Sequence, residues 1–265
     1  MDAKGSCGAQ QFANLFYFCR MPEQSLQPFI FEDLGRMDYQ PAWDYQEKLL
    51  QQNVAVKSNR NNEDPPGSSQ TKHHLLFVEH SPVYTLGKSG KIEHVLIDEA
   101  ERNRRSIQFF KTNRGGDITF HGPGQLVGYP IFDLEKIYTD IGLYLRNVEE
   151  VIIQTMLEYG LEGKRSAGET GVWLDPDLPG RERKICAIGV RCSRWITMHG
   201  FAFNVNTDLS YFDHIIPCGI RQKGVSSLQK ELGREIPMEE VKQVVLEKFC
   251  QVFRLKPEPT RPALV

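Results

Sequence analysis

The sequence has no cysteine spacing of the kind that builds disulfide frameworks or structural zinc sites. Its six cysteines are spread over 265 residues and form no Cys-x-x-Cys pair. Small secreted scaffolds and zinc modules depend on dense or paired cysteines, so neither class is indicated. We therefore expect free thiols and a reducing compartment.

Long apolar runs and an excess of charge are also missing. No stretch approaches the roughly 20 apolar residues of a membrane span. The longest runs, such as Leu75–Val78, suit buried strands. The 32 basic and 34 acidic residues leave a formal net charge of −2, which argues against a non-specific nucleic-acid binder. We expect a protein that neither crosses a membrane nor binds nucleic acid.

Residues 1–25 lack the features of a targeting segment. The aromatic group Phe16–Phe18 is too short for the apolar core of a secretory signal, and no small-residue cleavage site follows. Asp2, Glu23 and the single Arg20 suit a transit peptide poorly. We expect a flexible tail and a cytoplasmic protein, and leave an organellar form open.

Residues 57–72 differ in composition from the rest of the chain. They are rich in Asn, Ser, Pro and Gly and show no apolar periodicity, which predicts a solvated, mobile loop. No other segment is typical of a linker. We therefore expect one domain over residues 1–265, with a monomer as the default state.

Short strands alternate with a few amphipathic helices. Apolar residues recur every three or four positions over Asp140–Tyr159, with Asp140 as the expected N-cap. Pro130 predicts that its strand lies at a sheet edge or is broken. The order of elements predicts a mixed-sheet domain of the α/β or α+β class. The expected strands are Phe29–Leu34, Leu75–Glu79, Ile107–Phe110, Ile118–His121, Leu126–Leu134, Gly171–Trp173, Ile185–Val190 and Met198–Val205, and the other expected helices are Ala42–Gln52 and one that begins at Pro237.

A glycine-rich segment, Arg114–Gln125, is the first candidate for a binding site. It holds four glycines beside an arginine and a histidine. Glycines let the backbone approach a ligand, and successive N–H groups can cradle a carbonyl or an anion. The alternative is a tight hairpin with a surface arginine. No Gly-Lys-Ser/Thr follows and the glycine spacing is not that of a Rossmann loop, so neither nucleotide-binding motif is present.

Lys184 and Cys218 are candidates for chemistry. Lys184 stands at the head of an apolar strand, where a lysine is most often solvated, although a lysine desolvated in a pocket can act as a base. Cys218 lies between a proline and a glycine, which predicts a turn whose N–H groups can point at a reactive sulfur. A buried structural thiol is the commoner alternative. We expect structural roles for Cys186, Cys192 and Cys250.

The segment His199–Asn204 is a third candidate. Gly200 permits close approach of the backbone to a ligand, and the alternative is a strand that begins with a polar surface histidine.

Taken together, these segments resemble the lipoyl (octanoyl) transferase family over about Phe29–Phe253. The glycine-rich segment alone is shared loosely with lipoate and biotin ligases, whereas Lys184 combined with Pro-Cys218-Gly is much more specific. The resemblance implies a fold similar to the biotin/lipoate protein ligase catalytic domain, a mixed sheet with helices around it. The matching stretches are Arg114–Gln125, Gly171–Trp173, Lys184–Gly189, His199–Asn204, Asn206, Asp208, Leu209 and Pro217–Gly219.

The resemblance also implies an activity. An octanoyl group would pass from octanoyl-acyl carrier protein to a lysine of lipoyl domains, in 2-oxoacid dehydrogenase complexes and the glycine cleavage H protein, with no cofactor or metal. Cys218 matches the cysteine that forms an acyl thioester, and Lys184 matches the lysine that promotes its ionisation and serves as acid and base. The implied substrate-binding residues are Arg114, Gly115, Gly116, Asp117, Ile118, Thr119, Phe120, His121, Ala187, Ile188, Gly189, Gly200, Phe201 and Ala202.

Three other functions stay open at this point. An ATP-dependent lipoate or biotin ligase would need no cysteine nucleophile. A non-catalytic relative would bind acyl carrier protein or lipoyl domains without Cys218 or Lys184, and both are present. A cysteine hydrolase could use His121 or His199 as its base.

The sequence departs from the family pattern in two places, neither of which removes a catalytic residue, and the second of them could alter how the protein partners dock. The two places are the insertion-like residues 57–72 and the longer approach to Lys184 over Asp175–Arg183. Arginines in and after that approach could steer acidic partners, although ordinary solvated charge is the alternative. These are Arg181, Arg183, Arg191 and Arg194.

Overall fold

A mixed nine-stranded sheet forms the centre of the molecule. The computed structural model describes residues 26–59, 70–216 and 223–258. The strand order is β12-β1-β2-β6-β10-β9-β8-β7, with β11 added beside β9. β1 runs parallel to β2 and β12, and antiparallel pairs join the strands from β2 to β7. The bounds are β1 Gln27–Met37, β2 His73–His80, β6 Gln125–Ile131, β7 Lys164–Ser166, β8 Glu169–Leu174, β9 Arg183–Ser193, β10 Ile196–Asn204, β11 Gly224–Val225 and β12 Leu255–Pro257.

A small second sheet stands at one end of the first. Its order is β4-β3-β5, with β3 at Val83–Leu86, β4 at Gln108–Lys111 and β5 at Ile118–His121. Short helices lie beside it or at the sheet ends. These are η1 Ile92–His94, α2 Glu99–Arg104, η2 Leu134–Lys136, η3 Leu209–His214 and α4 Leu228–Leu232.

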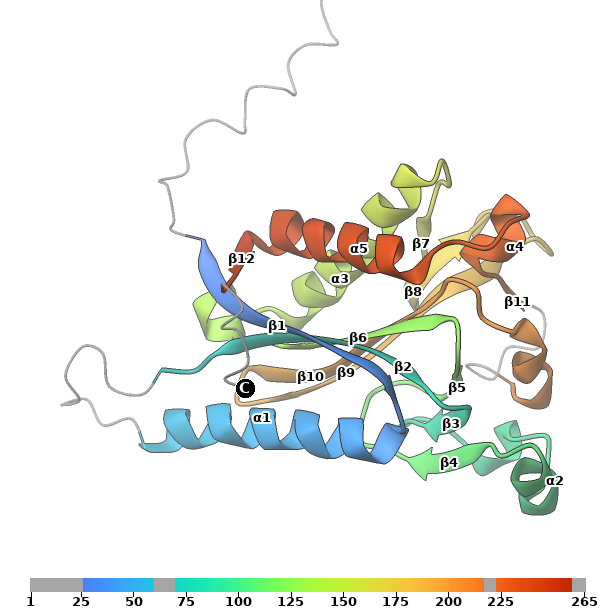
Figure 1. Cartoon of the computed structure of the whole chain (residues 1–265), viewed down its shortest axis with the longest axis horizontal. Coiled ribbons are helices and arrows are strands. Elements are labelled where there is room, and N and C mark those ends of the chain that lie inside the picture. The colour runs from blue at the N-terminus through green and yellow to red at the C-terminus, as the bar shows by residue number, and fades with distance from the viewer. Residues whose placement is uncertain (1–25, 60–69, 217–222, 259–265) are drawn as a thin grey trace, which may run out of the picture.

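Three longer helices cover the two faces of the main sheet (Figure 1). Helix α1 (Tyr39–Asn59) packs on one face, and α3 (Ile141–Glu158) and α5 (Met238–Phe253) pack on the other. Side chains alternate between the faces of a strand. Accordingly, Leu75 and Phe77 of β2 join the α3 and α5 side, whereas Leu76 and Val78 join the α1 side. The continuous apolar run therefore marks a strand buried on both faces.

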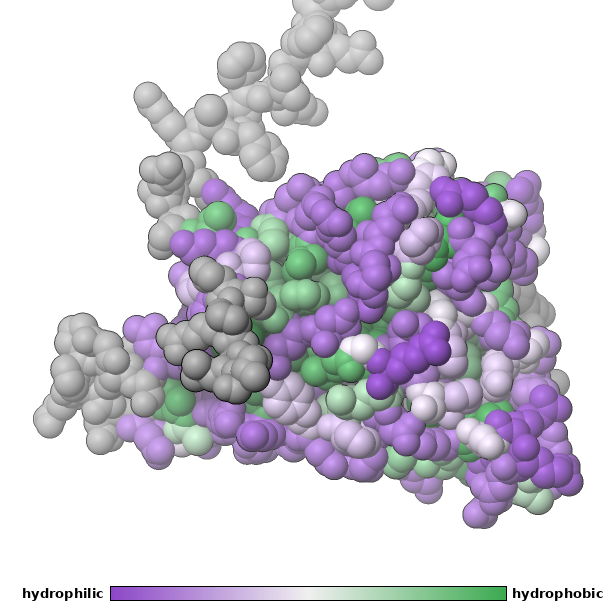
Figure 2. Space-filling model, viewed as in Figure 1, coloured by the Kyte–Doolittle hydropathy of each residue, from purple (hydrophilic) through white to green (hydrophobic). Residues whose placement is uncertain are grey.

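The predicted α/β class and mixed sheet are confirmed. Every predicted strand and helix is present, with bounds that shift by a few residues. The Asp140 carboxylate caps α3 by accepting a hydrogen bond from Leu143 N at 2.9 Å. The outward surfaces over α5 and along α1 are mostly hydrophilic, as the helical periodicity requires (Figure 2). Among the described helices, none is long and apolar enough to cross a lipid bilayer.

Pro130 does not lie at a sheet edge as one alternative expected, but the expected break is present in the pairing of its strand with β10. Pro130 lies in β6, between β2 and β10. The β6–β10 ladder stops at Gly128, and the Pro130 carbonyl faces β10, where it accepts a hydrogen bond from Thr197 Oγ1 at 2.8 Å. N–H and C=O of one strand residue point to the same side, so the missing N–H faces a place where no ladder bond is made.

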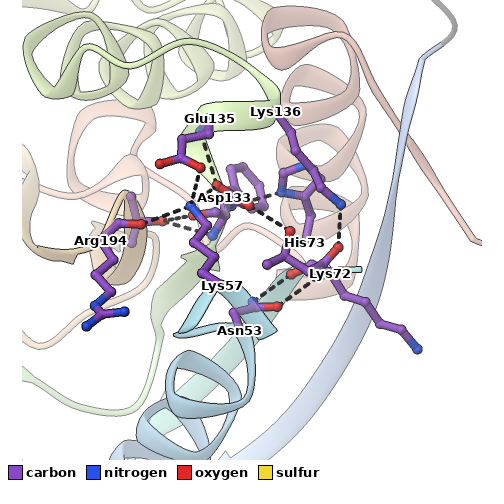
Figure 3. Close-up of polar contacts among 11 residues, drawn as sticks. Asn53, Lys57, Lys72, His73, Asp133, Glu135, Lys136 and Arg194 are labelled. Atoms are coloured by element: carbon purple, nitrogen blue, oxygen red, sulfur yellow. Dashed lines mark hydrogen bonds and ion pairs between the residues drawn. The ribbon is translucent and has the colours of Figure 1, made fainter. Parts of the chain in front are cut away.

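Asp133 ties the ends of three segments together (Figure 3). Its buried carboxylate accepts hydrogen bonds from Lys57 Nζ at 2.5 Å and Thr71 Oγ1 at 2.6 Å. Lys72 N donates to Asn53 Oδ1 at 2.8 Å in the same cluster. The borders of the predicted loop 57–72 are therefore wrong. Residues 57–59 belong to α1, and the hydrogen bonds of Thr71 and Lys72 fix these two residues to the rest of the fold. Residues 60–69 and the predicted tail 1–25 lie outside the described residues.

Strand β2 begins and ends with buried histidines. His73 Nδ1 accepts a hydrogen bond from Asp133 N at 3.1 Å. His80 Nδ1 bonds the Met37 carbonyl at 2.8 Å, and its Nε2 bonds the Tyr129 hydroxyl at 2.6 Å. Burial lowers the pKa of each imidazole to about 4. Both rings are therefore neutral in the folded protein at neutral pH.

Replacement of Asp133 by Asn should destabilise the fold strongly. It leaves the largely buried Lys57 ammonium without its closest carboxylate, and breaking such a pair costs about 3 kcal/mol. Glu135→Gln is the matched control, because Glu135 also contacts Lys57 but is 51% exposed, so its loss costs below about 1 kcal/mol. Urea unfolding measures both values, and equal effects would contradict this role for Asp133.

Stability should also fall in mild acid. An imidazole whose pKa is about 4 in the folded chain and about 6.5 in the unfolded chain binds fewer protons when folded, so protonation favours unfolding below pH 6.5. His73 and His80 should each remove about 2 kcal/mol of unfolding free energy between pH 7 and pH 5. Urea unfolding at pH 7 and at pH 5 measures how far the free energy of unfolding falls between them, and this fall should be smaller in His80→Gln. If the substitution left this fall in unfolding free energy unchanged, His80 would not contribute to the loss of stability in acid.

Candidate active site

A cavity of about 490 Å³ opens between the glycine-rich segment and the strands β8–β10. Lys184 lines it, and so does every predicted substrate-binding residue except Phe120. Phe120 instead stacks on Tyr211, with ring centroids 4.4 Å apart, in the core beneath the small sheet. The predicted residues that line the cavity are Arg114, Gly115, Gly116, Asp117, Ile118, Thr119, His121, Lys184, Ala187, Ile188, Gly189, Gly200, Phe201 and Ala202.

The glycine-rich segment contacts β9 through its backbone. Gly115 N donates a hydrogen bond to Val190 O at 2.9 Å. A Cβ atom on Gly189 would lie 2.8 Å from Gly115 O, which is closer than real Cβ contacts come. Only glycine therefore lets these two backbone segments approach each other. This contact closes one wall of the cavity with backbone atoms.

The side chain of Arg114 is buried, so the interpretation of the glycine-rich segment as a hairpin with a surface arginine is wrong. It is 8% exposed. Its Nη2 donates to Thr85 O at 2.6 Å and to Thr85 Oγ1 at 2.9 Å, and its Nη1 donates to Gly115 O at 2.9 Å. The guanidinium therefore fixes the glycine-rich segment to β3 of the small sheet.

A chain of hydrogen bonds continues from Thr85 into the main sheet. Thr85 Oγ1 lies 3.2 Å from His121 Nε2, and His121 Nδ1 lies 2.9 Å from Gln125 Oε1. Gln125 Nε2 donates to Asn204 Oδ1 at 2.9 Å. Both ring nitrogens of His121 are engaged, and burial, followed by the charges of neighbouring groups, holds its pKa well below the usual range.

The same chain ends at the backbone of Lys184. Asn204 Nδ2 donates to Ser226 O at 2.9 Å, and Ser226 N donates to Lys184 O at 2.9 Å. The network thus connects the two cavity walls that hold Arg114 and Lys184, and fixes their backbones relative to each other.

Lys184 extends over an aromatic surface. It pairs with Trp173 of β8, and its Nζ lies 4.6 Å from the centroid of the indole. Gly171 has φ +123°, and a Cβ there would meet Cys186 O at 2.6 Å and the Lys184 Cδ and Cε atoms at 3.5 Å. Glycine at this position therefore allows the positive φ and the close approach of β8 to Cys186 O, and the lysine stem runs beside it.

Much of the cavity lining is apolar. It includes aliphatic and aromatic side chains of β6, α3, β9, β10, η3 and β11. Such a surface suits a linear hydrocarbon chain, since each buried methylene contributes roughly 0.8 kcal/mol. These side chains are Val127, Leu145, Ile188, Val190, Phe201, Phe212 and Val225.

His199 is poorly placed to act as a base beside Lys184. It pairs with Val190, six residues along β9 from Lys184, which corresponds to roughly 20 Å of strand. Burial, followed by the charges of Arg114 and Arg191, lowers the pKa of His199 to about 3. Its Nε2 is bound to Asn113 Oδ1 at 2.7 Å. Together with the occupied nitrogens of His121, this argues against the hydrolase alternative.

Cys218 lies outside the described residues. Its described neighbours in the chain are Ile216, whose N–H donates to His94 O at 2.8 Å, and Lys223, which lines the cavity. Cys186 is buried, and burial raises the pKa of its thiol. Cys192 is exposed, so the structural role expected for it is wrong, because β9 ends at the surface there.

The four arginines do not form one cluster. Arg183 and Arg191 stand near opposite ends of β9, since an extended strand separates residues that are close in sequence. Arg183 pairs with Asp175 and Glu231, and Arg191 pairs with Glu47. Their charges are thus used largely within the molecule, contrary to the expectation of a shared steering surface.

Several residues of the site were not found from the sequence. Thr85, Glu169 and Lys223 lie outside the motifs that carried the prediction, and only the topology brings them to the cavity or to Arg114. The position of Lys223, five residues after Cys218, was the one available signal. Within the described ranges, no group of three His, Cys, Asp or Glu side chains could hold a metal ion.

Comparison with known proteins places this site in a family. The family model of the lipoyl protein ligase A/B catalytic domain matches residues 38–250. An octanoyltransferase of Christiangramia forsetii is 55% identical over 225 residues, 84% of this chain and 94% of the relative. An octanoyltransferase of Cytophaga hutchinsonii is 48% identical over 242 residues, 91% of this chain and 98% of the relative.

Solved structures agree on the fold. A bipartite lipoate protein ligase of Thermoplasma acidophilum superposes with a TM-score of 0.63 at 16% identity, over 88% of this chain and 87% of that one. A lipoate-protein ligase A bound with ATP gives 0.59 at 15% identity, over 88% and 90%. The predicted likeness to a lipoate ligase catalytic domain is confirmed. The chain belongs to the lipoyl protein ligase A/B catalytic domain family, and within it to the octanoyltransferases.

Proposed function

We propose that this protein transfers an octanoyl group from octanoyl-acyl carrier protein to a lysine of a lipoyl domain, through a thioester on Cys218. The observation that carries the proposal is Lys184, whose ammonium lies on Trp173 in the lining of a largely apolar cavity that glycine backbone also lines. The identity to octanoyltransferases over most of the chain supports the acyl group.

In the first half-reaction, the Cys218 thiolate attacks the carbonyl carbon of the octanoyl thioester. The C–S bond to the carrier breaks, and the departing thiolate takes a proton from the Lys184 ammonium to leave as the free thiol. A free cysteine is only a few per cent ionised at neutral pH, so a nearby cation increases the reactive fraction. Backbone N–H groups of the glycine-rich segment are suited to stabilise the oxyanion that forms.

In the second half-reaction, an amine of the lipoyl domain attacks the acyl-Cys218 thioester. Neutral Lys184 accepts the proton that the amine loses, the C–S bond breaks and an amide forms. One cavity thereby serves two bulky proteins in turn, which predicts ping-pong kinetics. Conversion of a thioester to an amide is downhill, so the proposed reaction needs neither nucleotide nor metal.

The acyl chain would lie along the apolar lining of the cavity. Ile188 of β9 and Phe201 of β10 pair directly across the two strands and both line the cavity. Each methylene buried there adds roughly 0.8 kcal/mol, so chain length is selected only weakly per carbon. We propose a cytoplasmic enzyme whose acceptors are lipoyl domains of 2-oxoacid dehydrogenases and the glycine cleavage H protein.

The test is octanoyl transfer without ATP and magnesium, measured for the parent protein and for Lys184→Arg. Arginine keeps the positive charge but does not release its proton, so turnover should fall by about 100-fold or more. Lys248→Arg is the matched control, because Lys248 pairs with Glu158 between α5 and α3, away from the cavity. Near-normal turnover of Lys184→Arg would contradict proton transfer by Lys184, and a strict need for ATP would point to a ligase.

A further inference from the structure

Two lysine ammonium groups meet on one indole inside the cavity. Lys184 Nζ lies 4.6 Å from the centroid of Trp173, and Lys223 Nζ lies 4.9 Å from it. Both distances are within the range of cation–π attraction. Trp173 is 3% exposed, so its ring forms a wall of the cavity. The proposed mechanism uses Lys184 and gives Lys223 no role.

Glu169 supplies a negative charge beside this ring. Its Oε1 pairs with Lys223 Nζ, and its Oε2 is shielded from solvent and accepts no hydrogen bond from the described residues. Glu169, Trp173 and Lys223 all line the cavity, next to Lys184. A carboxylate with an unused oxygen beside an aromatic face is the chemistry that recognises a lysine ammonium.

We propose that Glu169 and Trp173 form the subsite for the lysine ammonium of the acceptor, and that Lys223 fills this subsite until the acceptor arrives. The inference rests on the proposed function, which requires a lysine to enter the cavity beside Lys184. Lys223 is itself a lysine side chain and already makes both contacts that an incoming lysine needs. Because Trp173 pairs with Lys184 across β8 and β9, an amine held on this ring lies next to the base.

The proton balance is consistent with this role. The acceptor binds as an ammonium ion, and it loses one proton to water to become the nucleophilic amine. The amine attacks the thioester carbon, the new C–N bond forms, and Lys184 takes the second proton. The C–S bond breaks and leaves the Cys218 thiolate beside the Lys184 ammonium, which is the starting state. Glu169 is a binding residue in this scheme and forms no bond to the acyl group.

A purely structural ion pair makes a different prediction. If Glu169 and Lys223 only hold β8 against β11, removal of either partner should damage the enzyme in the same way. If Lys223 competes with the acceptor, removing it should improve acceptor binding, whereas removing the Glu169 charge should weaken it. The two partners of one ion pair then have opposite effects.

The experiment starts from purified octanoyl-enzyme of the full chain and measures its discharge against the concentration of a lipoyl domain. The half-saturating concentration should rise about fivefold in Glu169→Gln and fall about fivefold in Lys223→Met, as expected for one partly exposed ion pair. Glu158→Gln is the control, because it removes a carboxylate from another lysine pair, between α3 and α5. It should leave the half-saturating concentration unchanged.

Discharge by hydroxylamine is the second measurement, since this nucleophile is uncharged at neutral pH. Its rate should depend far less on Glu169→Gln than the rate with the lipoyl domain does. Shifts in the same direction for Glu169→Gln and Lys223→Met, or equal effects on both nucleophiles, would overturn the inference. Failure of the parent to form any octanoyl-enzyme would instead overturn the proposed function.

Discussion

The site depends on one contact, the approach of the glycine-rich backbone to β9. Gly115 donates to Val190, and Gly189 opposite it leaves no Cβ in the way. Without this contact the glycine-rich segment would not be held against β9, and the cavity would lose a wall. Arg114 strengthens the contact from the other side through Thr85. The glycines therefore matter less as flexible residues than as places where two backbones can meet.

A network of polar side chains then fixes the cavity wall that holds Arg114 relative to the wall that holds Lys184. The hydrogen bonds from Thr85 through His121, Gln125 and Asn204 reach the strand that holds Lys184. Their donors and acceptors are satisfied inside a protein interior, where an unpaired group is costly, so the network favours one arrangement. The cavity combines this rigid polar frame with a largely apolar lining, a combination that suits the proposed acyl substrate with its charged reaction partners.

Much of the fold was predictable because its elements obey local rules. The apolar residues of α3 recur at helical spacing after the capping residue Asp140. The continuous apolar run of β2 is typical of a strand that is buried on both faces. Pro130 lies inside the sheet and not at its edge, because its missing N–H faces a stretch of β10 where the ladder is broken. Of the fourteen substrate-binding residues that the resemblance implied, all except Phe120 line the cavity, whereas the residues that surround an acyl chain could not be named from the sequence. Glu169 and Lys223 could not be found in this way, because their pairing depends on how β8 and β11 flank β9.

The most direct test of the account is the mass of the intact protein after mixing with octanoyl-acyl carrier protein in the absence of ATP, with Cys218→Ala measured in parallel. The account predicts one octanoyl adduct on the parent, none on the variant, and loss of the adduct when a lipoyl domain is added. A folded parent that gains no adduct, or an adduct that persists in Cys218→Ala, would contradict acyl transfer through Cys218.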